Sequence, residues 1–157
     1  MGKLPLPGPN GQPLIRILDP QAPARHAVNW PTMEISKTFQ IEAAHRLPNV
    51  PAGHKCARMH GHSFRIGIHV RGPLDPQLGW VMDYADIKAA FAPLFEQLDH
   101  HCLNEVPGLE NPTSERLAVW IWQRLQPRLP ALSQVIVHET CTSTCRYAGE
   151  PVSAADP

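Results

Sequence analysis

Two kinds of hydrophobic pattern follow one another along the chain. Apolar and polar residues alternate over Glu34–His45 and again over Ser63–Gly72, which is typical of half-buried β-strands. Shorter alternating runs at Ser133–Thr140 and Ser143–Ala148 predict a third and a fourth strand. Between the two pairs of strands the apolar residues recur at helical spacing instead.

Two amphipathic helices are therefore predicted in the middle of the chain. The first begins at Asp83, a favourable N-cap, and Pro93 within it is expected to kink the helix rather than to end it. The second is capped by Thr113 or Ser114 and ends at Pro127. Their apolar faces consist of Ile87, Ala90, Phe91, Leu94, Phe95 and Leu98 in the first helix and of Leu117, Trp120, Ile121 and Leu125 in the second.

The order of these elements predicts one α+β domain at residues 33–150. With 157 residues the chain is long enough for one domain with its own core and short for two. Residues 1–32 are rich in proline and show neither periodicity, so we expect a disordered extension there, and a loose tail at 151–157. Met33 stands directly before the first strand and could be the true start of the protein.

Charge and hydropathy exclude several classes of partner. The 14 basic and 14 acidic residues give a net charge of zero, which offers no electrostatic footprint for nucleic acid or for an anionic membrane. No apolar run approaches the roughly 18 residues of a membrane span, and the N-terminus lacks the pattern of a secretory signal. We therefore expect a cytoplasmic protein whose four cysteines are free thiols.

Candidate metal ligands are concentrated between Ile41 and His62, in the stretch IEAAHRLPNVPAGHKCARMHGH. His60 and His62 are separated by one glycine, so on an extended chain their side chains point to the same side. His45 closes the first predicted strand and could supply a third imidazole. Three neutral imidazoles suit zinc and leave one coordination position open, as in catalytic sites.

Cys56, which lies between these histidines, admits two interpretations. As a fourth ligand it would close the site and make it structural; as a free thiol beside the metal it could take or give a proton. Lys55 and Arg58 flank it, and positive charge favours the thiolate. The two interpretations predict different kinds of protein.

Three further residues carry chemistry whose use the pattern alone leaves open. Asp99 could orient and charge His100 for proton transfer, or the two could be a surface pair at the end of a helix. Glu139, in an otherwise apolar strand, could bind a guanidine-like ligand edge through two hydrogen bonds, or it could lie at the edge of the sheet.

The order of motifs resembles a known family. FQIEAAHRLP, HKCARMHGHSF, WVMDYADIK, LDHHCLN, NPTSE and VIVHETCTSTC resemble the 6-carboxytetrahydropterin synthase family of the queuosine (7-deazaguanine) pathway, a branch of the 6-pyruvoyltetrahydropterin synthase superfamily. The resemblance extends from about Met33 to Glu150. It implies the tunnelling fold, a four-stranded antiparallel sheet with two helices on one face. It also implies a homohexamer, a dimer of trimers, with active sites at subunit interfaces.

The resemblance also implies a role for each candidate residue. The zinc ligands correspond to His45, His60 and His62. The other functional positions are the general-base thiol Cys56, the proton-relay pair Asp99 and His100, the carboxylate Glu139 that anchors the pterin, and Thr113 and Ser114, which line the pterin pocket.

The implied reaction converts 7,8-dihydroneopterin triphosphate to 6-carboxytetrahydropterin, acetaldehyde and triphosphate. A 6-pyruvoyltetrahydropterin synthase would eliminate triphosphate from the same substrate without breaking the carbon-carbon bond, but the short Cys-x-x-x-His-Gly-His spacing favours the carboxy branch. A non-catalytic zinc module closed by Cys56 is the alternative from another class. Which residues hold the triphosphate stays open, with Lys55, Arg58 and Arg65 as candidates.

Overall fold

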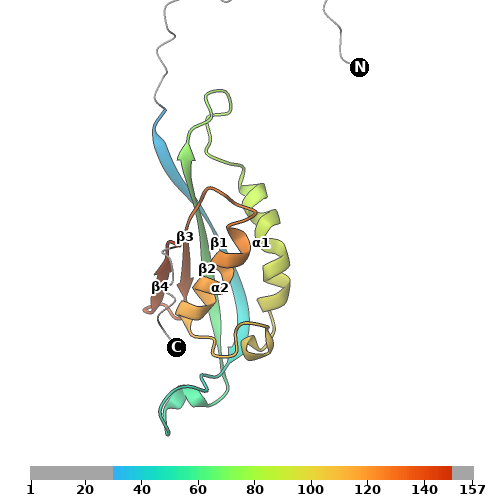
Figure 1. Ribbon diagram of the computed structural model, residues 1–157, viewed down its shortest axis with the longest axis vertical. Coiled ribbons are helices and arrows are strands. Elements are labelled where there is room, and N and C mark those ends of the chain that lie inside the picture. Colours follow the sequence, from blue (N-terminus) through green and yellow to red (C-terminus); the bar gives the residue numbers. More distant parts are fainter. Residues whose placement is uncertain (1–29, 150–157) are drawn as a thin grey trace, which may run out of the picture.

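The computed structural model describes residues 30–149, which form one antiparallel sheet with two helices on one of its faces (Figure 1). The strands are hydrogen-bonded in the order β1-β2-β3-β4. This arrangement confirms the predicted sheet and the predicted pair of helices. In chain order the elements are β1 (Thr32–His45), the 3-10 turn η1 (Lys55–Ala57), β2 (His60–Pro73), α1 (Tyr84–Leu98), the 3-10 turn η2 (Leu103–Glu105), α2 (Ser114–Leu125), β3 (Leu132–His138) and β4 (Thr144–Tyr147).

Several boundaries differ from the prediction. β1 begins at Thr32, so this residue, which was assigned to the extension, belongs to the sheet. β3 ends at His138, so the prediction that Glu139 lies within the strand is wrong. The chain turns toward β4 at this point, and the Glu139 N–H donates to the Ser143 carbonyl (3.2 Å) to close the turn. The extension predicted before residue 30 and the tail after Glu150 lie outside the described residues.

The helices begin where their caps predict. The Asp83 carboxylate accepts a hydrogen bond from the Ala85 N–H (2.8 Å) at the start of α1, and the helix continues past Pro93. Of the two candidate caps of α2, Thr113 is the one used, because its hydroxyl accepts a hydrogen bond from the Arg116 N–H (3.3 Å).

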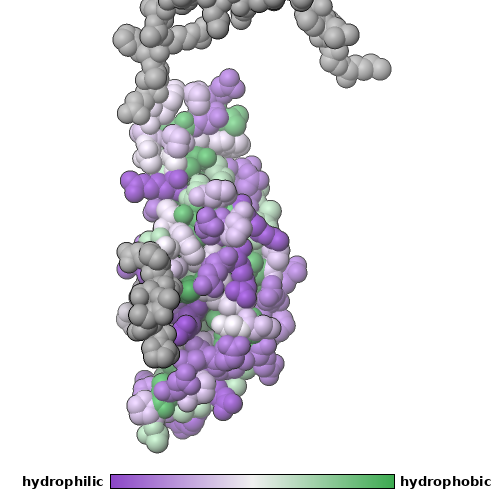
Figure 2. All heavy atoms as spheres, in the orientation of Figure 1, coloured by the Kyte–Doolittle hydropathy of each residue, from purple (hydrophilic) through white to green (hydrophobic). Residues whose placement is uncertain are grey.

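The core lies between the helices and the face of the sheet that they cover. α1 packs on β1, and α2 packs on β3 and β4. Burying one large apolar side chain stabilises the fold by roughly 1.5–3 kcal/mol. In Figure 2 the described surface on the side of the helices is mostly hydrophilic, as expected for their outer faces. No helix within residues 30–149 combines the length and the hydropathy needed to cross a membrane. The largest fully buried side chains are Phe64, Phe91, Ile41, Ile66, Ile68, Ile87, Leu98, Leu103, Leu109, Leu117, Ile121 and Leu125.

The register between β1 and β2 places the histidines at one end of this core. His45 is the partner of His60, and Ala43 is the partner of His62. Because side chains alternate along a strand, these three histidines lie on the face that the helices cover, whereas Glu42 lies on the other face.

Candidate metal centre

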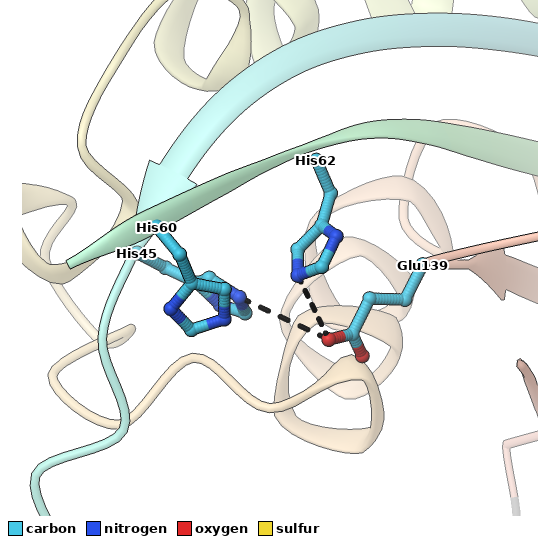
Figure 3. A group of neighbouring side chains, drawn as sticks. All are labelled: His45, His60, His62 and Glu139. Atoms are coloured by element: carbon cyan, nitrogen blue, oxygen red, sulfur yellow. Dashed lines mark ion pairs between the residues drawn. The ribbon is translucent and has the colours of Figure 1, made fainter. Parts of the chain in front are cut away.

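Four side chains converge at this end of the core: His45 from β1, His60 and His62 from β2, and Glu139 from the turn after β3 (Figure 3). One potential ligand atom of each lies within 4.8 Å of those of the others. The centroid of the His45 ring is 4.5 Å from that of His60 and 5.2 Å from that of His62. At these separations a single ion can contact several of the side chains.

Backbone carbonyls orient two of the imidazoles. Nδ1 of His45 lies 2.9 Å from the carbonyl oxygen of Pro112, and Nδ1 of His60 lies 2.8 Å from that of Arg58. A carbonyl can only accept, so each Nδ1 carries the proton and each Nε2 presents a lone pair. This is the tautomer that binds a metal through Nε2.

The buried polar atoms of the cluster test whether a metal fits it. Nε2 of His45 and Nε2 of His62 are both buried and have no hydrogen-bond partner. Glu139 Oε1 lies 3.2 Å from Nε2 of His62 and 3.9 Å from Nε2 of His45 but forms no hydrogen bond with either. Leaving such atoms unsatisfied costs about 1–3 kcal/mol each, and a divalent cation would satisfy both together. Three imidazoles and a carboxylate are a donor set that suits zinc.

The environment of His45 keeps its ring neutral. Burial lowers its pKa, the hydrogen bond to Pro112 opposes this, and the neighbouring His60 lowers the pKa further. Because only the neutral imidazole has a free lone pair, this shift favours the form that binds a metal.

Glu139 joins the cluster to α2. Its Oε2 accepts a hydrogen bond from the hydroxyl of Ser114, the first residue of α2, at 2.5 Å, while Oε1 faces the histidines. Thr113, Ser114 and Glu139 line one pocket of about 290 Å³. The structure thus brings the three residues predicted for the pterin pocket together. It also places Glu139 among the potential metal ligands, which sequence reasoning missed because nothing in the sequence relates residue 139 to His45.

Cys56 lies beside the group but outside it. It belongs to η1 and lines a pocket of about 550 Å³ together with His60, His62 and Glu139. Its carbonyl accepts from the Leu47 N–H (2.8 Å), which ties η1 to the chain just after β1. The group of potential ligands therefore consists of three histidines and a carboxylate, and Cys56 does not complete a tetrahedron with the histidines.

Asp99 and His100 contact one another but not this cluster. Nδ1 of His100 lies 2.9 Å from Asp99 Oδ2. Glu42 in β1 holds both residues through its backbone, because its N–H donates to Asp99 Oδ1 (2.9 Å) and its carbonyl accepts from the His100 N–H (2.6 Å). The hydrogen bond from Glu42 lowers the pKa of Asp99, and the one from His100 lowers it further.

The pair lies at the outer edge of β1, an edge strand of the sheet. His100 has a left-handed backbone (φ 59°), is 77% exposed, and lines a pocket whose other lining residues include Glu42, Ser63 and His62, a member of the histidine cluster. No hydrogen bond, ion pair or ring contact within residues 30–149 joins it to His45, His60 or His62. Within the described part of one chain, His100 therefore shares a pocket with His62 but makes no direct contact with the three histidines.

Some contacts of the site had no signal in the sequence. The carbonyls of Pro112 and Arg58 orient two histidines, and the backbone of Glu42 holds the acidic pair. Backbone groups are present at every residue, so residue type could not reveal which of them act.

Fold and cluster together define a class: an α+β protein whose antiparallel sheet carries a candidate metal centre of three histidines and a glutamate. The chain belongs to the 6-pyruvoyl tetrahydropterin synthase family, whose sequence model matches residues 34–150. This confirms the family resemblance and, with the architecture described above, the tunnelling fold.

Individual relatives agree with this assignment. The chain is 45% identical over 119 residues to the 6-carboxy-5,6,7,8-tetrahydropterin synthase of Synechocystis sp., an alignment that covers 72% of this chain and 91% of that protein. It is 34% identical over 133 residues to human 6-pyruvoyl tetrahydrobiopterin synthase, covering 74% and 92% of the two chains. The structure of Caenorhabditis elegans 6-pyruvoyl tetrahydropterin synthase superposes with a TM-score of 0.72 at 25% identity, covering 78% of this chain and 99% of that one.

Proposed function

We propose that this protein is a zinc-dependent 6-carboxytetrahydropterin synthase. It would convert 7,8-dihydroneopterin triphosphate and one water to 6-carboxytetrahydropterin, acetaldehyde and triphosphate, as a cytoplasmic enzyme of queuosine biosynthesis. The observation that carries the proposal is the convergence of His45, His60 and His62 on one position, with two buried Nε2 atoms that lack partners. The 45% identity to a protein of that name supports the carboxy reaction over others of the family.

In this proposal His45, His60 and His62 would hold a zinc ion. The ion would supply Lewis acidity toward the hydroxyls of the substrate side chain, which would make the protons on those hydroxyls and on the adjacent carbon easier to remove. Cys56, which lines the same pocket as His60 and His62, takes such a proton as the general base. Glu139 and Ser114 hold the donor edge of the pterin ring, and Thr113 lines that pocket. A fixed ring removes part of the entropic barrier, because the reacting side chain is then already in place.

The proton-relay pair would come from a neighbouring copy of the chain. Asp99 orients His100, but the pair lies at the edge of β1, and although His100 lines a pocket with His62, no hydrogen bond or ion pair within residues 30–149 joins it to the histidine cluster of its own chain. A homohexamer built from two trimers, with each site at a subunit interface, would let His100 of one copy return protons at the cluster of the next.

A product assay tests the proposal. The purified protein is loaded with zinc and incubated with 7,8-dihydroneopterin triphosphate, and acetaldehyde and the pterin product are both measured. Acetaldehyde in equal amount to 6-carboxytetrahydropterin is the expected result. Tight zinc binding without any turnover would overturn the proposal in favour of a structural zinc module.

A second candidate is 6-pyruvoyltetrahydropterin synthase. It is favoured by the 34% identity to the human protein of nearly that name, and it would use the same substrate and the same cluster. The same assay separates the two, because this reaction would release triphosphate and a pyruvoyl product without acetaldehyde.

A further inference from the structure

The cleft around the histidine cluster differs in charge from one end to the other. At the end next to α2, the pocket of about 290 Å³ is lined by the hydroxyls of Thr113 and Ser114 and by the carboxylates of Glu115 and Glu139. None of the described residues that line it is a lysine or an arginine. This end suits a neutral ligand edge that donates hydrogen bonds, and it repels anions.

The adjoining end is basic. Glu139 and Ser143 also line the pocket of about 550 Å³, so the two pockets share a wall, and here the lining includes Lys55 and Arg58. Within residues 30–149 every ion pair involves a histidine, so no carboxylate neutralises either cation. Two uncompensated positive charges therefore border the pocket that also contains Cys56.

The backbone holds these cations at a fixed place relative to the histidines. The Arg58 carbonyl accepts the hydrogen bond from His60 Nδ1 (2.8 Å), and the Arg58 N–H donates to the Lys55 carbonyl (3.3 Å). The hydrogen bond from the Leu47 N–H to the Cys56 carbonyl ties the same turn to the chain just after β1. Both side chains are exposed, so they can close on a ligand while their backbone stays in place.

We propose that Lys55 and Arg58 form the subsite for the anionic, polyphosphate part of the substrate. The inference rests on the proposed function. It implies one orientation of the substrate in the cleft, with the pterin ring at Glu139 and Ser114, the reacting side chain at the histidines, and the phosphates at η1. An arginine can bind phosphate oxygens with two parallel hydrogen bonds, and a lysine adds a compact positive charge.

Binding of inorganic tripolyphosphate to the zinc-loaded protein tests this subsite without requiring turnover. We expect Lys55→Gln and Arg58→Gln each to weaken binding by about tenfold or more, since a hydrogen bond to a charged group contributes about 1.5–3 kcal/mol. Binding of unphosphorylated dihydroneopterin should stay unchanged, because its ring is held at the other end of the cleft. Zinc content is measured after each titration, because polyphosphates also bind zinc.

Matched controls are Lys88→Gln in α1 and Arg128→Gln after α2, which remove the same charges from exposed positions away from the cleft. They should bind tripolyphosphate as the unmodified protein does. The Arg58→Gln change keeps the carbonyl that orients His60, so retention of zinc is expected and confirms an intact cluster.

The outcomes separate this proposal from the proposed function. Weaker tripolyphosphate binding in both variants supports the subsite even if the protein shows no turnover, which would overturn only the synthase. Unchanged binding in both variants, together with normal turnover of the unmodified protein, overturns the subsite and leaves the synthase in place.

Discussion

His45 and His60 are direct partners in the register of β1 and β2, and their ring centroids lie 4.5 Å apart. Each ring is fixed from behind by a backbone carbonyl, that of Pro112 for His45 and that of Arg58 for His60. Strand pairing therefore sets the spacing of the two imidazoles, and the loops on either side set the direction of their lone pairs. This preorganisation explains how a metal could bind without rearrangement of the sheet.

The first prediction concerns metal binding. His60→Ala should weaken zinc binding by more than about 100-fold and abolish turnover, because losing a ligand costs more than the 10- to 100-fold typical of outer-shell changes. Zinc content after dialysis is the measurement. His69→Ala, on the opposite face of the same strand, is the control and should retain zinc. A His60→Ala protein with full zinc content would show that His60 is not a ligand.

The second prediction separates Cys56 from the ligands. Cys56→Ala should keep zinc but lower kcat by about 10²–10⁴, the usual contribution of a general base. Zinc analysis and steady-state kinetics on the same sample provide the test. Cys141→Ala, which removes an exposed thiol, should leave both unchanged. Full activity of Cys56→Ala would eliminate the thiol as the base, and loss of zinc would make it a ligand.

The third prediction concerns the hydroxyl that holds Glu139. Ser114→Ala removes the 2.5 Å hydrogen bond to Oε2, so the carboxylate should lose its fixed orientation in the pocket proposed for the pterin. We expect kcat/KM to fall by about tenfold, since a hydrogen bond to a charged group contributes about 1.5–3 kcal/mol. The fold should be retained because Thr113, rather than Ser114, caps α2. Ser36→Ala, an exposed serine on the other face of the sheet, is the control. An unchanged kcat/KM would mean that Ser114 does not position the carboxylate.

Much of the fold was predictable because its signals are periodic and local. Alternation located β1 and β2, and helical spacing identified Ile87, Phe91, Leu94 and Leu98 as the buried face of α1. The prediction that the third strand includes Glu139 was wrong, because apolar alternation continues through His138 and does not show where the chain must turn. Periodicity therefore predicts which helices and strands form more accurately than it predicts the residues at which they end.

The gathering of the three histidines was predictable from the sequence, whereas the placement of the other candidate residues was less so. The His-Gly-His spacing places His60 and His62 on one face, and β1 brings in His45, as expected. The contact of Asp99 with His100 also follows from their being neighbours. Their position at the edge of β1 depends on the hydrogen bonds to Glu42, which no local pattern encodes.

The fourth prediction concerns how the stability of the sheet depends on pH. Glu34 on β1 accepts hydrogen bonds from Ser133 and from His69, and the one from Ser133 lowers its pKa most, although partial burial opposes the shift. Because the pKa is lower in the folded protein, the stabilisation is present above the unfolded-state pKa and is lost as pH falls through the folded-state pKa. The effect should stay below about 1 kcal/mol, since the side chain is 42% exposed and solvent screens it.

Urea unfolding at several pH values measures this effect. Glu34→Gln should be less stable than the unmodified protein at pH 7, and the difference should shrink as the pH falls below about 4. Glu96→Gln, an exposed glutamate on α1, should show no such trend. A difference that stays constant with pH would mean that the Glu34 charge does not stabilise the sheet.

The last prediction tests whether active sites are shared between copies. Cys56→Ala and Asp99→Asn should each be nearly inactive alone, since one removes the proposed base and the other the partner of His100. If Cys56 of one copy works with Asp99 and His100 of the next, mixed oligomers contain sites in which both are intact. Random association of equal amounts would restore about a quarter of the sites, because each of the two contributions is intact with a probability of about one half.

The two variants are co-expressed with different affinity tags, purified through both tags so that only mixed oligomers remain, and assayed for acetaldehyde. Mixtures of unmodified chains carrying the same tags give the reference activity. If one chain supplied the thiol and the relay pair to the same site, every site in the mixture would carry one of the two lesions. Mixed oligomers without recovered activity would therefore place the whole reaction within one chain. That result would require His100 to act through the pocket that it shares with His62 of its own chain, while the hydrogen bonds to Glu42 hold its backbone at the edge of β1.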